Sequence, residues 1–83
     1  MRMVDISLPA TERVQEFVGT ITALKGDFEL LSGQYVLDAR SLMGIFSLDL
    51  TQPIKLKIYN DSQDNMDAIA PFLAEKSGGR RDG

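Results

Sequence analysis

The sequence predicts an α+β fold in which a four-stranded antiparallel sheet is covered on one face by three helices. The first observation is the strict alternation of apolar and polar residues over 53–59, which is typical of a strand with one buried face. The second is a series of apolar residues at helical spacing after residue 11. The third is the turn dipeptide Ser32-Gly33 between two short apolar runs, which predicts a β-hairpin.

These elements follow in the order βαββαβα and form one domain, expected over residues 1–76. Helices on one face of the sheet would leave its other face open to solvent. The same local patterns also permit a ferredoxin-like βαββαβ arrangement followed by a terminal helix. Residues 77–83 combine glycines with charged groups and have nothing to bury, so we expect a disordered C-terminal tail.

The N-terminal strand shows a looser alternation that ends at Pro9. Its expected buried residues are Met1, Met3, Ile6 and Leu8. The helix that follows should begin at Ala10 or Thr11 and close near Gly26. Its apolar stripe consists of Val14, Phe17, Val18, Ile21 and Leu24. Gly19 within this helix costs about 1 kcal/mol relative to alanine, so either a neighbour packs closely there or the helix is locally weak.

Ser41 stands where the extended residues end and an apolar cluster begins, so its hydroxyl is expected to cap a short helix. The apolar residues of this helix cannot all face the core, and we expect Met43 and Phe46 to be exposed. The strand over 53–59 should bury Ile54, Leu56 and Ile58. In the last helix Pro71 removes a backbone donor, which predicts a kink or a short break.

Composition excludes several classes of function. The net charge of the 83 residues is −3, which argues against nucleic acid and anionic membranes as partners. Without cysteine there is no disulfide and no thiolate zinc site, and no metal or cofactor is expected. The sequence contains no histidine, and its acids, lysines and serines form no recognisable catalytic pairing, so we expect no enzyme activity. No signal-type apolar block follows the N-terminus, which favours a cytoplasmic protein.

One segment carries a family resemblance. It reads Asp38-Ala39-Arg40-Ser41-Leu42-Met43-Gly44-Ile45-Phe46-Ser47-Leu48. A basic residue, a serine, an aliphatic residue, Met-Gly, two apolar residues, serine and leucine follow each other as in HPr, the histidine-containing phosphocarrier of the bacterial sugar phosphotransferase system. The resemblance extends from about Met3 to Lys76. It implies an open-faced β-sandwich with four antiparallel strands and three helices.

The chain resembles a member of that family that lacks the active-site histidine. The alignment places the phosphorylated histidine of the family at Ala10, its phosphate-holding arginine at Glu12 and its following proline at Arg13. A methyl group has no lone pair to attack phosphorus, and a carboxylate repels a phosphoryl group. The resemblance therefore implies loss of phosphohistidine transfer. Arg13 is expected to be a solvated surface charge rather than an anion site.

The family's regulatory serine corresponds to Ser41, the candidate phosphorylation site. Phosphate there would lie near exposed helical N–H groups, with Arg40 able to add a contact. The resemblance implies protein docking through Arg40, Leu42, Met43 and Phe46, and as partners a serine kinase/phosphorylase and a sugar-responsive transcriptional regulator of catabolite repression. Capping alone also explains a serine at this position. The alternatives are a phosphocarrier with another nucleophile and a ferredoxin-like module that binds a small ligand.

Overall fold

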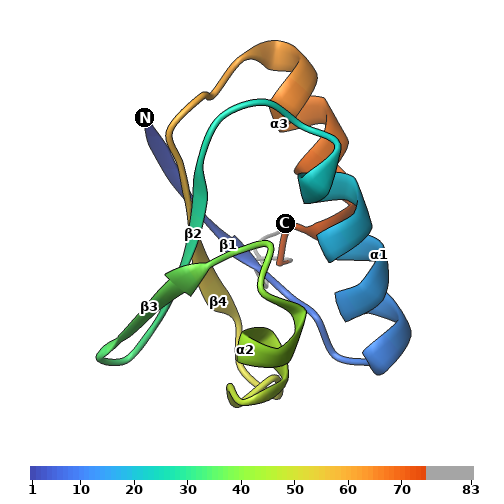
Figure 1. The fold of residues 1–83 in the computed structure, drawn as a ribbon, viewed down its shortest axis with the longest axis vertical. Coiled ribbons are helices and arrows are strands. Elements are labelled where there is room, and N and C mark those ends of the chain that lie inside the picture. The colour runs from blue at the N-terminus through green and yellow to red at the C-terminus, as the bar shows by residue number, and fades with distance from the viewer. Residues whose placement is uncertain (75–83) are drawn as a thin grey trace, which may run out of the picture.

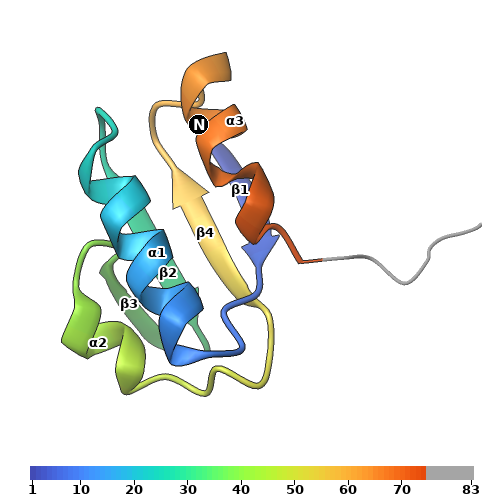
Figure 2. The ribbon, with the colours of Figure 1, turned by 90° about the vertical axis from the view of Figure 1, so that its right-hand side faces the viewer.

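Within residues 1–74, the part of the chain that the computed structural model describes, four strands form one antiparallel sheet. The helices lie together on one face of this sheet (Figures 1 and 2), which confirms the predicted open-faced α+β architecture. The elements are β1 (Arg2–Ile6), α1 (Thr11–Thr22), β2 (Phe28–Ser32), β3 (Tyr35–Asp38), α2 (Leu42–Phe46), β4 (Ile54–Ile58), α3 (Gln63–Ile69) and the 3-10 helix η1 (Ala70–Phe72). The predicted end of the domain at residue 76 and the predicted disordered tail lie outside the described residues.

The order of the strands in the sheet is β1-β4-β2-β3, and each of the three pairings is antiparallel. A ferredoxin-like split βαβ unit requires parallel strands joined by a crossover helix, so this alternative is wrong. The strand that shows the clearest alternation, β4, is an interior strand. Its two lysines, Lys55 and Lys57, alternate with buried isoleucine and leucine and therefore lie on the open face of the sheet. Because β4 is paired on both sides, they do not protect an edge.

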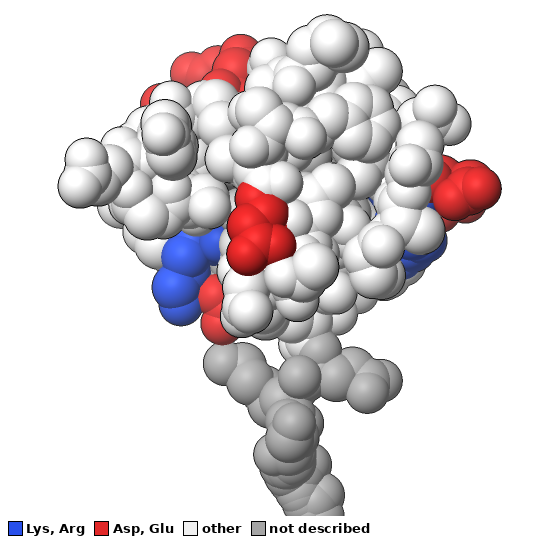
Figure 3. All heavy atoms as spheres, turned by 90° about the horizontal axis from the view of Figure 1, so that it is seen from below, with Lys and Arg blue, Asp and Glu red and all other residues white. Residues whose placement is uncertain are grey.

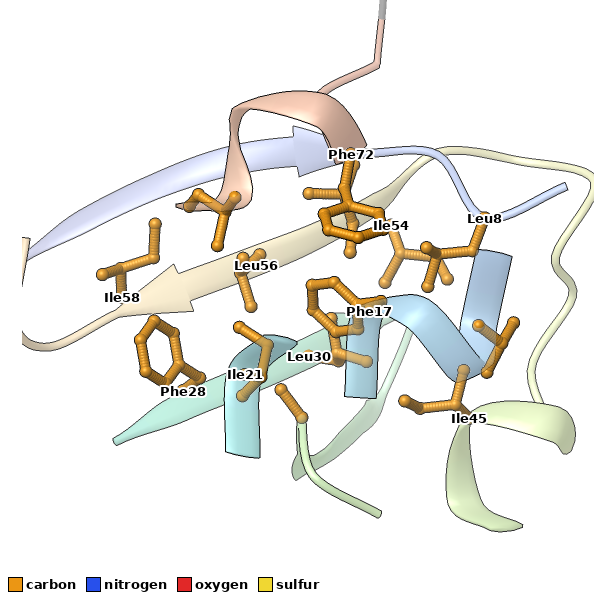
Figure 4. Packing of buried hydrophobic residues seen from close by; sticks show 14 residues of the cluster. Leu8, Phe17, Ile21, Phe28, Leu30, Ile45, Ile54, Leu56, Ile58 and Phe72 are labelled. Carbon is orange, nitrogen blue, oxygen red and sulfur yellow. The ribbon is translucent and has the colours of Figure 1, made fainter. Parts of the chain in front are cut away.

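The core lies between the sheet and the helices. Figure 4 shows Phe17 and Ile21 of α1 facing Leu30 and Leu56 of the sheet. The core residues from Ile6 to Phe72 are Ile6, Leu8, Val14, Phe17, Ile21, Phe28, Leu30, Ala39, Ile45, Ile54, Leu56, Ile58, Ile69 and Phe72. Burial of these side chains is the main favourable contribution to folding, since each large one contributes about 1.5–3 kcal/mol.

The predicted buried face of the first strand is partly wrong. Ile6 and Leu8 are fully buried, but Met3 is 49% exposed and Met1 is exposed as well. Val4 packs against the core instead, because successive side chains in a strand point to opposite faces and Val4 is in phase with Ile6. Met3 lies opposite Lys57 on the open face.

Helix α1 ends at Thr22, earlier than predicted, and a short turn follows it before β2. Gly26 in this turn has a φ of 98°, and a Cβ there would lie 2.7 Å from Asn60 Cβ. Glycine is therefore needed at 26 for both conformation and space. Gly19 is different, because nothing lies within 4 Å of its would-be Cβ. Of the two predicted explanations for Gly19, the structure supports local weakness of α1.

Pro71 ends the last helix as predicted. Helix α3 ends at Ile69, and residues 70–72 form η1 because proline has no N–H to continue the α-helical bonding. The chain then runs beside β1, where Ala74 N–H donates to Asp5 O at 2.9 Å and Leu73 forms a bridge with Ile6. The outer edge of β1 is therefore partly covered by the chain itself.

Candidate functional site

Two helix N-termini lie at the same end of the molecule. Helices α1 and α2 pack against each other, and Figure 2 shows α2 beside the first turn of α1. The sequence-predicted site residues divide between these two helices. Ala10, Glu12 and Arg13 belong to the start of α1, whereas Arg40, Ser41, Leu42, Met43 and Phe46 belong to α2 and the residue before its cap.

Ser41 caps α2, as predicted. Its Oγ accepts a hydrogen bond from Gly44 N–H at 3.3 Å, and its carbonyl oxygen accepts from Ile45 N–H at 3.0 Å. The Ser41 side chain is exposed to solvent. A Cβ at Gly44 would lie 2.8 Å from Ser41 Oγ and 3.2 Å from Leu37 Cδ1. Glycine at 44 therefore lets the capping hydroxyl come close to the helix, which gives a physical reason for the Met-Gly pair after the cap.

Helix α2 is amphipathic despite its five residues. Ile45 is fully buried, and Leu42 packs against the rim of the core. Met43 is 78% exposed and Phe46 is 37% exposed, which confirms the predicted exposure of both side chains. Leu42, Met43 and Phe46 together are called the α2 patch below. An unbranched methionine next to an aromatic ring is typical of surfaces that adapt to more than one partner.

The end of the molecule that carries α2 and the β2–β3 turn shows few charged groups, as Figure 3 illustrates. A shallow groove of about 620 Å³ lies between the turn and the segment after α2, and it is lined by Ser32, Gly33, Gln34, Tyr35, Ser47, Leu48 and Asp49. Asp49 is the one charged residue among them. Hydrogen bonds from the Thr51 hydroxyl and backbone N–H lower the pKa of Asp49.

Arg40 is occupied by the turn that follows α1. One guanidinium nitrogen, Nη2, donates to Leu24 O at 2.9 Å and to Gly26 O at 3.0 Å. The guanidinium carbon lies 5.5 Å from the centre of the Phe28 ring. These contacts connect the residue before Ser41 to the end of α1. The contact with a phosphate on Ser41 expected from the sequence would therefore compete with two backbone carbonyls.

The cap residue of α1 has no reactive side chain. Ala10 is the N-cap residue, it is exposed, and its side chain makes no capping hydrogen bond. Its carbonyl oxygen accepts from the N–H groups of Arg13 and Val14. Glu12 is exposed in the first turn, where a carboxylate is favourable for the helix dipole. The structure thus places a methyl group and an acid at the positions that the resemblance associates with phosphate.

The expectation that Arg13 is a solvated surface charge is wrong in part, because its side chain is 36% exposed and contacts other parts of the protein. Its Nη2 donates to Pro71 O at 2.7 Å, and its Nη1 pairs with Glu16 Oε1 at 2.6 Å. The guanidinium carbon lies 4.5 Å from the centre of the Phe72 ring, which in turn contacts Phe17 edge-on. Arg13 therefore connects α1 to η1 across 58 residues of sequence. No local pattern could have predicted this long-range contact.

A buried amide was also missed. Asn65 is 5% exposed, and its Nδ2 donates to Lys25 O and Asn60 O at 2.9 Å each. These bonds connect α3 to two loops, so the amide is structural. Residues 1–74 contain no group of three or more acidic, histidine or cysteine side chains that could hold a metal ion.

Comparison with known proteins shows the fold. The crystal structure of HPr-C-His from Thermoanaerobacter tengcongensis is similar, with a TM-score of 0.72 and 22% sequence identity over 88% of this chain and 91% of that one. At this identity the likeness shows a common fold, so the chain has an HPr-like open-faced sandwich. No family model and no curated protein matches the sequence. Among the described residues no helix is both long enough and apolar enough to cross a membrane.

Proposed function

We propose that this protein is an HPr-like regulatory protein that acts by docking to other proteins and does not carry phosphohistidine. The observation that carries the proposal is the position of an exposed serine hydroxyl, Ser41, beside the exposed Met43 and Phe46. A modifiable group at the N-cap and an apolar contact surface on the five-residue helix α2 thus lie side by side. The HPr-like fold supports a relation to phosphocarrier proteins of the sugar phosphotransferase system.

Phosphorylation of Ser41 would act as the switch. In this step a kinase transfers the γ-phosphoryl group of ATP to Ser41 Oγ, ADP leaves, and the hydroxyl proton passes to a base of the kinase. The product carries a charge of about −1.5 to −2 at neutral pH. Placed beside the α2 patch, this charge would oppose partners with an apolar or acidic surface and favour partners with a basic one. The proposed partners are a serine kinase/phosphorylase and a sugar-responsive transcriptional regulator.

The absence of histidine supports the proposal that the protein does not carry phosphohistidine. Phosphohistidine transfer needs an imidazole nitrogen as nucleophile, and the 83 residues contain no histidine. Ala10 occupies the cap of α1 without any polar side-chain atom. The proposed role therefore depends on shape and docking, in the cytoplasm where such partners occur, with no chemistry performed by the protein itself.

The test is intact-mass measurement after incubation with the serine kinase of the phosphotransferase system and ATP. The expected result is a mass increase of one phosphate, which Ser41→Ala abolishes while circular dichroism shows that the variant remains folded. An authentic HPr treated alongside is the positive control. An unchanged mass, with the control phosphorylated, would remove the switch from the proposal.

A second arm of the experiment tests loss of the carrier activity. The protein is incubated with phosphoenolpyruvate and the first enzyme of the system, and its mass is expected to stay unchanged. A phosphorylated product in this arm would show that another side chain serves as nucleophile, which is the alternative considered from the sequence. The two arms fail independently, so the switch and the loss of carrier activity are judged separately.

A further inference from the structure

The two edges of the sheet differ in how they are covered. On the β1 side, Ser7 N–H donates to Phe72 O and Ala74 N–H donates to Asp5 O, both at 2.9 Å, so the chain after η1 already pairs with this edge. On the β3 side, no strand of residues 1–74 pairs with the outer edge. An uncovered edge presents backbone donors and acceptors to any strand that approaches it.

The pairing of β3 with β2 determines which backbone groups face outward. Ser32 and Tyr35 flank the two-residue turn and are register partners, so they form the hydrogen-bonded pair that closes the hairpin. Hydrogen-bonded pairs recur at every second residue, and Ala39 N–H indeed donates to Phe28 O at 2.9 Å. Val36 falls between these pairs, so its N–H and C=O point away from β2 into solvent.

The side chains of β3 do not protect this edge. Tyr35 is 70% exposed and Val36 is 59% exposed, on opposite faces of the sheet. Natural edge strands are usually protected by short length, lysine, proline or a bulge, and β3 has only its four-residue length over Tyr35–Asp38. Asp38, its single charge, lies at the end of the strand, where its backbone oxygen already accepts from Ser41 N–H.

We propose that the outer edge of β3 binds β3 of a second copy of this chain, so that two sheets join into one antiparallel sheet. The two-fold axis passes between the two Val36 residues, each of which donates its N–H to the carbonyl oxygen of the other. On the face that the helices cover, Tyr35 lies opposite Leu37 of the second copy. This arrangement covers both large exposed side chains of the strand and is self-complementary, as a two-fold interface requires.

The charge of the strand is compatible with this occupant and register. Asp38 lies opposite Gln34 of the second copy, so the acid faces a neutral amide that can donate a hydrogen bond. The two Asp38 residues are four positions apart along the joined strands, or about 13 Å at about 3.3 Å per residue. This separation exceeds the Debye length of about 10 Å at 0.1 M salt, so their repulsion is largely screened. The single charge of the strand therefore does not prevent the two copies from pairing.

The experiment is sedimentation velocity of the full chain at protein concentrations from about 10 µM to about 1 mM. High concentrations are needed because so short an edge buries little area and the dimer is expected to be weak. The expected result is a concentration-dependent dimer, with hydrogen exchange at the Val36 amide slowing as the dimer forms. Val36→Lys introduces a charge at the axis and is expected to return the protein to the monomer. Val36→Pro removes the outward N–H without breaking a bond to β2 and should do the same.

Met3→Lys is the matched control, since Met3 is an exposed apolar residue of the open face on the opposite edge strand. It should leave the dimer intact. A monomer at all concentrations would overturn the proposal. A dimer that survives both Val36 substitutions, that Met3→Lys disrupts equally, or in which the Val36 amide exchanges as fast as in the monomer, would also overturn it.

Discussion

Helices α1 and α2 start at the same end of the molecule but satisfy their first N–H groups differently. At α2 a serine hydroxyl accepts the hydrogen bond of Gly44 N–H, and the adjoining residues Met43 and Phe46 face solvent. At α1 the cap residue is Ala10, whose side chain accepts nothing. The comparison shows that a helix start without a polar cap can persist when tertiary packing supports the helix, because α1 buries Val14, Phe17 and Ile21.

The two helices also differ in whether their polar side chains stabilise the fold or are available to other molecules. Two charged side chains near the start of α1 contact the protein itself: Arg13 binds Pro71 O, and Glu16 pairs with Arg13. Helix α2 and its cap leave an exposed hydroxyl and two exposed apolar side chains available to other molecules. Substitutions in α1 should therefore change stability, whereas substitutions in α2 should change both stability and the proposed docking.

The largest effect on stability is expected for Arg13→Ala. It removes a charged hydrogen bond to Pro71 O and the contact with the Phe72 ring. Such interactions contribute about 1–3 kcal/mol together when partly exposed, so we expect a loss of about 2 kcal/mol in the free energy of unfolding. Urea denaturation measures it.

The control is Glu16→Gln, which breaks only the exposed ion pair with Arg13 and should cost less than about 0.5 kcal/mol. Equal and small losses in the two variants would show that Arg13 does not connect α1 to η1. Added phosphate should not stabilise the wild type more than Arg13→Ala, because the guanidinium is already engaged.

An intermediate effect is expected from exchanging the two caps. Ser41→Ala should lower the free energy of unfolding by about 1 kcal/mol, since it leaves Gly44 N–H without its partner. Ala10→Ser should raise it by about 0.5–1 kcal/mol by supplying the cap that α1 lacks. Thermal and urea unfolding of both variants measure the two changes. Effects of the same sign would contradict the comparison of the two helix starts.

A similar or smaller effect is expected for the pair of glycines. Gly19→Ala should stabilise the protein by up to about 1 kcal/mol, because alanine is the better helix former and nothing lies within 4 Å of the new Cβ. At Gly44 the same gain in helix propensity is opposed by the close approach of the new Cβ to Ser41 Oγ. We therefore expect Gly44→Ala to be less stable than Gly19→Ala, and a Gly44→Ala variant as stable would show that the cap does not need glycine.

Much of the fold could be predicted from the sequence because its signals are local. The alternation around Leu56, the turn at Gly33, the cap at Ser41 and the break at Pro71 each depend on residues that are neighbours in the chain. Local signals do not show which face of β1 is buried. Met3 and Val4 are both apolar and adjacent, so only the contacts with the core decide which of them is buried.

The exposed residues of the candidate site could be predicted from the sequence, but the contacts of the neighbouring side chains could not. The exposure of Met43 and Phe46 followed from the short length of α2, on which one side faces the core. The partners of Arg13 and of Arg40 did not, because both guanidinium groups bind carbonyl oxygens 58 and 14–16 residues away. The burial of Asn65 was missed for the same reason, since its amide serves two loops that meet only in the folded chain.

The most direct test of the central claim is to map the contact surface by following backbone amide signals while the isotope-labelled protein is titrated with the serine kinase. The account predicts that the largest signal changes cluster at Ser41, Met43 and Phe46, and that Met43→Asp weakens binding at least tenfold while Gly19→Ala leaves it unchanged. Signal changes confined to α3 or to the open face of the sheet, or binding that Met43→Asp does not weaken, would contradict it.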